Sequence, residues 1–248
     1  MQELTKNYYG SLCTEMYEIL HEKAPEDELA FYLSYAVKGG KILEPLCGSG
    51  RFLVPFMERG FDIQGVDMSE EMLGKLKEKA PGARVICGDM TSFICEEKYD
   101  YIFISSGSVS LFTDMNMCKA VLRQIRALLA PGGKFVFAVD TLADRVQEST
   151  EYGTALSVKT KEGLDLVMKG KNHFDESTQT QYSPSIYELY KDGELLCKEP
   201  MDFQTHLYRL GEMEQYLKEA GFSDIAVYGS FDKKAADEQS EMFLYECY

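Results

Sequence analysis

Positive charge is scarce in this sequence, and nowhere is it concentrated. The chain has 26 Lys and Arg residues against 41 Asp and Glu residues, a formal net charge of −15 over 248 residues. Lys75, Lys77 and Lys79 are interleaved with acidic residues, as on the solvated face of a helix. Such a chain repels nucleic acid phosphates and anionic lipids. We therefore expect a small-molecule substrate, with no nucleic acid and no membrane as partner.

Long apolar runs and paired cysteines are also missing. No apolar stretch reaches membrane-spanning length, and residues 1–6 lack the charged segment and apolar run of a signal peptide, so we expect a cytoplasmic protein. The seven cysteines form no C-x-x-C pair, and four lie in apolar runs, where cysteine packs as a small hydrophobic residue. His21 and His173 have no Cys or carboxylate partner at ligand spacing. We expect neither disulfides nor a metal site.

Short apolar runs alternate with amphipathic stretches up to residue 140. Helical spacing over residues 6–36 predicts N-terminal helices. Beyond them we expect strands at 41–44, 62–66, 84–86, 99–104 and 134–139, and helices at 51–59, 69–78 and 116–129. This alternation predicts an α/β fold with a doubly wound, mostly parallel sheet covered on both faces.

The pattern changes after residue 140. Longer alternating strands follow, with turn signals at 161–163, 174–176 and 191–193, which predicts an antiparallel β meander. A helix at 210–220, ended by Gly221, precedes strands at 225–228 and 241–246 that are too close for a crossover helix. We expect a seven-stranded sheet with an antiparallel last strand. The predicted parts are a helical lid (1–36), a core (37–142 and 209–248) and an inserted β region (143–208) that forms a substrate wall or a homodimer contact.

The strongest local signal is Glu44-Pro45-Leu46-Cys47-Gly48-Ser49-Gly50-Arg51. A strand ends in an acid, the chain turns through glycines, and a helix begins, so backbone amides can approach a ligand. A dinucleotide fingerprint is the competing interpretation. The acid precedes the glycines here and none follows three residues after Gly50, which opposes a pyrophosphate site.

Two further acids end the next two predicted strands. Asp67 ends the second strand, where a doubly wound fold places the carboxylate that binds ribose hydroxyls, and Asp89 follows the third. The alternative is that each acid is a helix cap or a turn residue. Three acids at the carboxyl ends of successive strands favour one ligand crevice.

These residues resemble the motifs of class I methyltransferases that use S-adenosylmethionine. Glu44 to Gly50 is similar to their glycine motif, with Leu46 in place of its first glycine; we expect Leu46 to have a negative φ. Asp67-Met68 and Asp89-Met90 resemble their ribose and adenine motifs, and residues 128–133 the turn before their fifth strand. The resemblance covers about residues 40–140 and implies S-adenosylmethionine as cofactor.

The resemblance also implies roles for individual residues. Glu44 would hold the methionine ammonium beside the amides of Gly48 and Gly50, Asp67 the ribose and Asp89 the adenine amino group. The remaining members of the implied cofactor site are Tyr9, Arg51, Met68, Met90, Ser105 and Ser106. Methionines of this kind also occur as core residues, and serines at strand exits as caps or turns, and these alternatives stay open.

The acceptor side leaves a weaker trace, because an in-line methyl transfer needs alignment more than a signature nucleophile. Tyr17, His206, Tyr208 and Arg209 are candidates for the acceptor side, although each also suits a packing role. Two functions remain: a methyltransferase for a small-molecule N or O acceptor, and a non-catalytic module that binds S-adenosylmethionine or its demethylated product. A lid and an inserted wall favour an enclosed second pocket and therefore catalysis.

Overall fold

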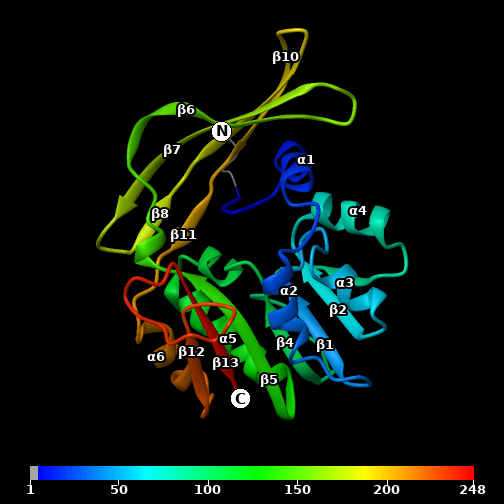
Figure 1. Cartoon of the computed structure of the whole chain (residues 1–248), viewed down its shortest axis with the longest axis vertical. Helices are drawn as coiled ribbons and strands as arrows, with labels where there is room; N and C mark the ends of the chain where they lie inside the picture. Colours follow the sequence, from blue (N-terminus) through cyan, green and yellow to red (C-terminus); the bar gives the residue numbers. More distant parts are fainter. Residues whose placement is uncertain (1–4) are drawn as a thin grey trace.

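Two β-sheets organise the chain in the computed structural model, which describes residues 5–248 (Figure 1). The first has the order β12-β13-β5-β4-β1-β2-β3. Its strands are β1 (Lys41–Pro45), β2 (Asp62–Asp67), β3 (Arg84–Cys87), β4 (Tyr99–Ile104), β5 (Leu129–Asp140), β12 (Ile225–Tyr228) and β13 (Met242–Cys247). β13 runs antiparallel to both of its neighbours, β12 and β5, and the remaining neighbours in this sheet pair in parallel. The predicted seven-stranded, mostly parallel sheet with an antiparallel last strand is confirmed.

Helices cover both faces of this sheet because its strands are apolar on both sides. Phe103 packs toward α2 (Glu26–Leu33), α3 (Leu53–Glu58) and α4 (Glu70–Lys79). Its neighbour Ile104 packs toward α5 (Met115–Leu128) and α6 (Glu212–Glu219). Because successive side chains of a strand point to opposite faces, each strand contributes side chains to the cores on both faces of the sheet.

The second sheet is antiparallel, as expected, and lies beyond the carboxyl ends of the parallel strands (Figure 1). Its strands are β6 (Ser149–Lys159), β7 (Asp165–Asp175), β8 (Thr180–Tyr182), β9 (Ser185–Lys191), β10 (Glu194–Met201) and β11 (Gln204–His206). The helix α1 (Ser11–Leu20) packs on this sheet through Cys13 and Met16, which are buried with Leu166 and Tyr187. The two N-terminal helices therefore pack on different sheets: α1 lies on the second sheet, whereas α2 belongs to the core of the first.

Most predicted strand and helix boundaries differ from the structure by one or two residues, and the start of the fifth strand differs by five. Residues 129–133, expected as a turn, form the irregular start of β5, with a register shift against β4. Gly132 adopts φ 78°, and a Cβ on Gly133 would lie 2.8 Å from the Tyr99 carbonyl oxygen, so the glycines let the chain run close along β4. Two short 3₁₀ helices, η1 (Ser108–Leu111) and η2 (Leu142–Asp144), follow β4 and β5. No helix within residues 5–248 is both long and apolar enough to span a membrane.

Candidate active site

The glycine turn after β1 is left-handed at several positions. Leu46, Gly48 and Gly50 have φ of 55°, 50° and 79°. The expectation of a negative φ at Leu46 is therefore wrong: the turn keeps the conformation that suits glycine, at a cost of about 1–3 kcal/mol for a side chain with a Cβ. A Cβ on Gly50 would lie 2.8 Å from the Leu76 Cγ, so α4 packs directly on this turn.

Asp67 at the end of β2 ties the glycine turn to the next loop. Its Oδ2 accepts a hydrogen bond from the Gly48 amide at 2.7 Å, and its Oδ1 accepts one from the Ser69 amide at 2.9 Å. Burial raises the pKa of Asp67, and these backbone donors oppose the rise. Each oxygen keeps a second lone-pair direction for a ligand.

Glu44 is the most deeply buried acid at this edge of the sheet. The residue as a whole is 1% exposed; Oε1 accepts a hydrogen bond from the Ser105 hydroxyl at 3.2 Å, and Oε2 has no partner among the described residues. Burial raises its pKa well above the ordinary range. An unpaired buried carboxylate is costly, and a nearby cation would relieve that cost.

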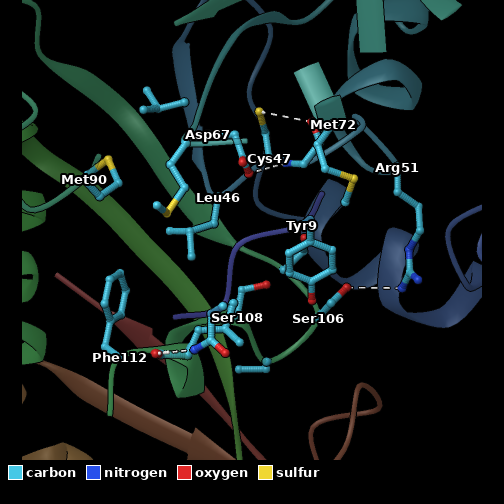
Figure 2. A pocket seen from close by; sticks show the side chains of 18 of the residues that line it. Tyr9, Leu46, Cys47, Arg51, Asp67, Met72, Met90, Ser106, Ser108 and Phe112 are labelled. Atoms are coloured by element: carbon cyan, nitrogen blue, oxygen red, sulfur yellow. Dashed lines mark hydrogen bonds between the residues drawn. The ribbon is translucent and has the colours of Figure 1, made fainter. Parts of the chain in front are cut away.

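A cavity of about 700 Å³ lies over these strand ends (Figure 2). We call it the main cavity. It is lined by the loops after β1, β2 and β3, by residues 105–108 after β4, by the end of β5, and by parts of the N-terminal segment. Among residues 5–248, six non-glycine residues have a positive φ, and three of them line this cavity: Asn7, Leu46 and Ser106. Backbone strain of this kind concentrates at ligand sites.

Met68, Asp89 and Met90 line one end of the main cavity. Asp89 is exposed, and its Oδ1 accepts a hydrogen bond from the Thr91 amide at 2.8 Å, as a turn residue does. Met68 is 40% exposed while Met90 is buried, so only Met68 presents a largely free side chain.

Tyr9 and Tyr17 enter the main cavity from the N-terminal segment. Their rings meet edge to face with centroids 6.1 Å apart, and in Figure 2 the Tyr9 ring lies between the glycine turn and Ser106. The Tyr9 carbonyl accepts a hydrogen bond from the Ser69 hydroxyl at 2.7 Å, which fastens this segment to the loop after β2. The segment therefore covers the middle of the cavity.

Arg51, Ser106 and Glu28 form a polar network around the buried Glu28 that the sequence did not reveal in full. Arg51 donates to the Ser106 hydroxyl at 3.1 Å and lies 3.6 Å from the Glu28 carboxylate. Glu28 in turn accepts a hydrogen bond from the Ser106 amide at 2.8 Å. Only a contact between α2 and the loop after β4 brings Glu28 here, and sequence spacing carries no signal for it.

Several residues expected at the site do not line the main cavity. Glu44 and Gly50 lie beneath it, and His206, Tyr208 and Arg209 lie elsewhere. His206 is 2% exposed and its Nε2 lies 2.9 Å from a Glu212 oxygen. Asp140, at the end of β5, does line the cavity. It was not among the predicted site residues, although an acid that ends a strand was available as a signal.

Known proteins share both this sequence pattern and this fold. A family model described as "Methyltransferase domain" matches residues 42–133, which contain the glycine turn, Asp67 and Asp89. The chain therefore contains a methyltransferase domain. This methyltransferase is 22% identical to YqeM of Bacillus subtilis, a provisionally assigned methyltransferase, over 93% of each chain.

Solved structures show the same fold for this methyltransferase. An S-adenosylmethionine-dependent methyltransferase from Clostridium acetobutylicum matches with a TM-score of 0.77 and 18% identity, over 94% of this chain and 95% of that one. The sugar N-methyltransferase KedS8 from a Streptoalloteichus species matches with a TM-score of 0.74 and 17% identity, over 99% and 98%. The inserted antiparallel sheet lies within both matches.

Proposed function

We propose that this methyltransferase acts on a nitrogen or oxygen atom of a small molecule. The main support for this proposal is the extent of the main cavity. It continues past the loops after β1, β2 and β3 to the ends of β4 and β5, beneath Tyr9. The volume of about 700 Å³ is that of a site for drug-sized molecules. The relative KedS8 is a sugar N-methyltransferase, which agrees with a small acceptor.

The residues at the ends of β1 to β3 fit the methyl donor. The unpaired Glu44 carboxylate suits a cationic group, to which it would couple through the Ser105 hydroxyl. The free lone pairs of Asp67 suit ribose hydroxyls, and Met68 and Met90 provide apolar contacts for a flat ring. When bound, the donor supplies a methyl group on a positively charged sulfur. Tyr9 and Tyr17 exclude water and hold an acceptor in line.

A screen with labelled S-adenosylmethionine tests this function. Amines, hydroxylated metabolites and thiols are incubated with the protein, and label is counted in each product. We expect transfer to small amines or hydroxyl compounds and none to DNA or RNA. Transfer confined to thiols, or to none of the three classes, would refute the proposal. Calorimetry should show binding of S-adenosylhomocysteine, and an equal or tighter affinity for NAD would refute the donor site.

A further inference from the structure

Five acids line the main cavity, and Asp140 differs from the other four. Each of those four accepts a hydrogen bond from a backbone amide: Glu28 from Ser106, Asp67 from Gly48 and Ser69, Asp89 from Thr91, and Asp114 from Asn116. No backbone amide and no Lys, Arg or His side chain of residues 5–248 binds the Asp140 carboxylate; the Ser110 hydroxyl alone favours its charged form. Among residues 5–248, Asp140 is thus the lining acid whose carboxylate binds no backbone amide.

The position of Asp140 is fixed from several sides. Its amide donates to the Ser110 hydroxyl at 2.8 Å, and its carbonyl accepts from the Tyr208 amide at 2.9 Å. A Cβ on Gly107 would lie 2.4 Å from the Asp140 Oδ1, so the carboxylate rests against the backbone just after Ser106. It therefore lies at the ends of β4 and β5, beyond the donor-binding acids of β1 to β3.

In the described part of the chain, none of the basic side chains that line the cavity (Lys6, His21 and Arg51) forms an ion pair with Asp140. Arg51 pairs with Glu28, and the Lys6 ammonium donates to the Thr113 hydroxyl at 2.9 Å. The other titratable groups that act on Asp140 are Asp144 of η2 and Tyr9, and neither is a cation. Burial first, and then Asp144, raise the pKa of Asp140 to about 7. Such a carboxylate is half ionised near neutrality, where a proton acceptor is most effective.

We infer that Asp140 is a catalytic residue that binds the acceptor as an ammonium ion and takes its proton. This inference rests on the proposed function and narrows the acceptor to an amine. An ammonium has no lone pair, so one N–H proton must pass to the Asp140 carboxylate before attack. The nitrogen lone pair then forms the C–N bond while the C–S bond breaks and its electron pair goes to sulfur. The product leaves as the methylated ammonium, and Asp140 returns its proton to water.

A second cavity lies close to Asp140. Met242 pairs with Asp140 in the β5–β13 ladder. Met242 and Phe231 line the main cavity and also a second, shallower cavity between α2 and the loop that joins β12 to β13. Phe231 and Met242 therefore form a shared wall of the two cavities beside Asp140.

Sinefungin tests Asp140 before any acceptor is known, because it carries an amino group in place of the transferred methyl. Its affinity is compared with that of S-adenosylhomocysteine by calorimetry. Above pH 7.5 the protein should prefer sinefungin, and the preference should fall below pH 7. In Asp140→Asn the ratio of sinefungin affinity to S-adenosylhomocysteine affinity should fall by at least about tenfold. The affinity for S-adenosylhomocysteine should stay within about threefold of the parent value, which also shows that the variant is folded. An unchanged preference in Asp140→Asn would overturn the inference.

Turnover separates this inference from the proposed function. With labelled donor, Asp140→Asn should methylate amines at least about 100-fold more slowly than the parent. Asp144→Asn, outside the cavity, should keep turnover above pH 7.5 and shift the acid limb of kcat/KM to lower pH. Parent protein that methylates only hydroxyl compounds, or an Asp140→Asn variant with normal amine turnover, overturns the role of Asp140 and leaves the proposed function intact. If the parent protein methylates no small N or O acceptor, the proposed function is refuted. The sinefungin comparison then still tests whether Asp140 binds an ammonium group.

Discussion

The two ends of the main cavity are built differently. The donor end comes from one continuous stretch that contains the loops after β1, β2 and β3, and its lining acids Asp67 and Asp89 are held by backbone amides. The acceptor end gathers residues from distant parts of the chain, including Asn7, Glu28 and Asp140. The donor end is thus formed by loops close together in the sequence and by their backbone amides. The acceptor end depends on how two sheets and the N-terminal segment pack together. The acceptor end is therefore where we expect tuning to a particular substrate.

Removal of the cover should separate the two ends most strongly. Deletion of residues 1–22 takes away Tyr9 and Tyr17, and we expect turnover to fall by at least about 100-fold because the acceptor is no longer held in line. S-adenosylhomocysteine binding should weaken by only about tenfold or less.

The matched control for this deletion keeps the helix and its aromatic residues. Glu15→Gln with Glu18→Gln breaks the α1 ion pairs to Lys75 and Lys79, which are partly exposed and contribute little. The deletion must first be folded and monodisperse, because α1 buries Met16 against the second sheet. Normal turnover in folded, deleted protein would contradict a lid made by residues 1–36.

Asp67→Ala should damage the donor end and spare the fold. The carboxylate is a charged acceptor, and each hydrogen bond to such a group contributes about 1.5–3 kcal/mol. S-adenosylhomocysteine affinity should fall by one to a few factors of ten, measured by calorimetry. Asp62→Ala at the opposite end of β2, where the exposed carboxylate pairs with Arg84, is the control and should bind as the parent does. Parent-like affinity in Asp67→Ala would make this acid a structural link between two loops and nothing more.

Glu44 offers a subtler test at the same end. Burial raises its pKa in the free protein, and a cation bound nearby should lower that pKa again, so binding should release a fraction of a proton. Titrations of S-adenosylhomocysteine at pH 7 in buffers of different ionisation enthalpy measure this release. Glu44→Gln should abolish it. A release that survives in Glu44→Gln must come from another group.

The donor end of the cavity could be predicted from the sequence better than the acceptor end, for a physical reason. An acid at the end of a predicted parallel strand must lie at the carboxyl edge of the sheet, so Glu44, Asp67 and Asp89 could be grouped from the strand pattern alone. His206 was a candidate because it ends an alternating strand, but alternation does not say which face meets a cavity, and its imidazole is buried against Glu212. The sign of φ at Leu46 was missed because the turn, more than the residue type, decides it.

Glu28 shows what sequence patterns cannot reach. It lies in the first turn of α2, where an acid is expected for favourable interaction with the helix dipole. Its contacts with Arg51 and Ser106 arise only when α2 packs beside the loops after β1 and β4. No spacing rule relates three such segments.

The smallest expected effect is on the stability of the fold. It arises because Asp140, at the acceptor end, is partly buried without a counter-charge among the described residues. The pKa of Asp140 rises from its ordinary value near 3.8 to about 7 in the folded protein. Between these two values the unfolded chain loses the proton and the folded chain keeps it, so the stability of the folded state falls as pH rises to 7 and stays low above it. Asp140→Asn removes this penalty. It should raise the free energy of unfolding by about 1–2 kcal/mol at pH 8, after allowance for solvent in the cavity, and by much less at pH 5. Urea unfolding of parent and variant at both pH values measures the difference. A variant that is equally or less stable than the parent at pH 8 would mean that Asp140 carries no such penalty, and the contrast between the paired acids of the donor end and the unpaired acid of the acceptor end would then fail.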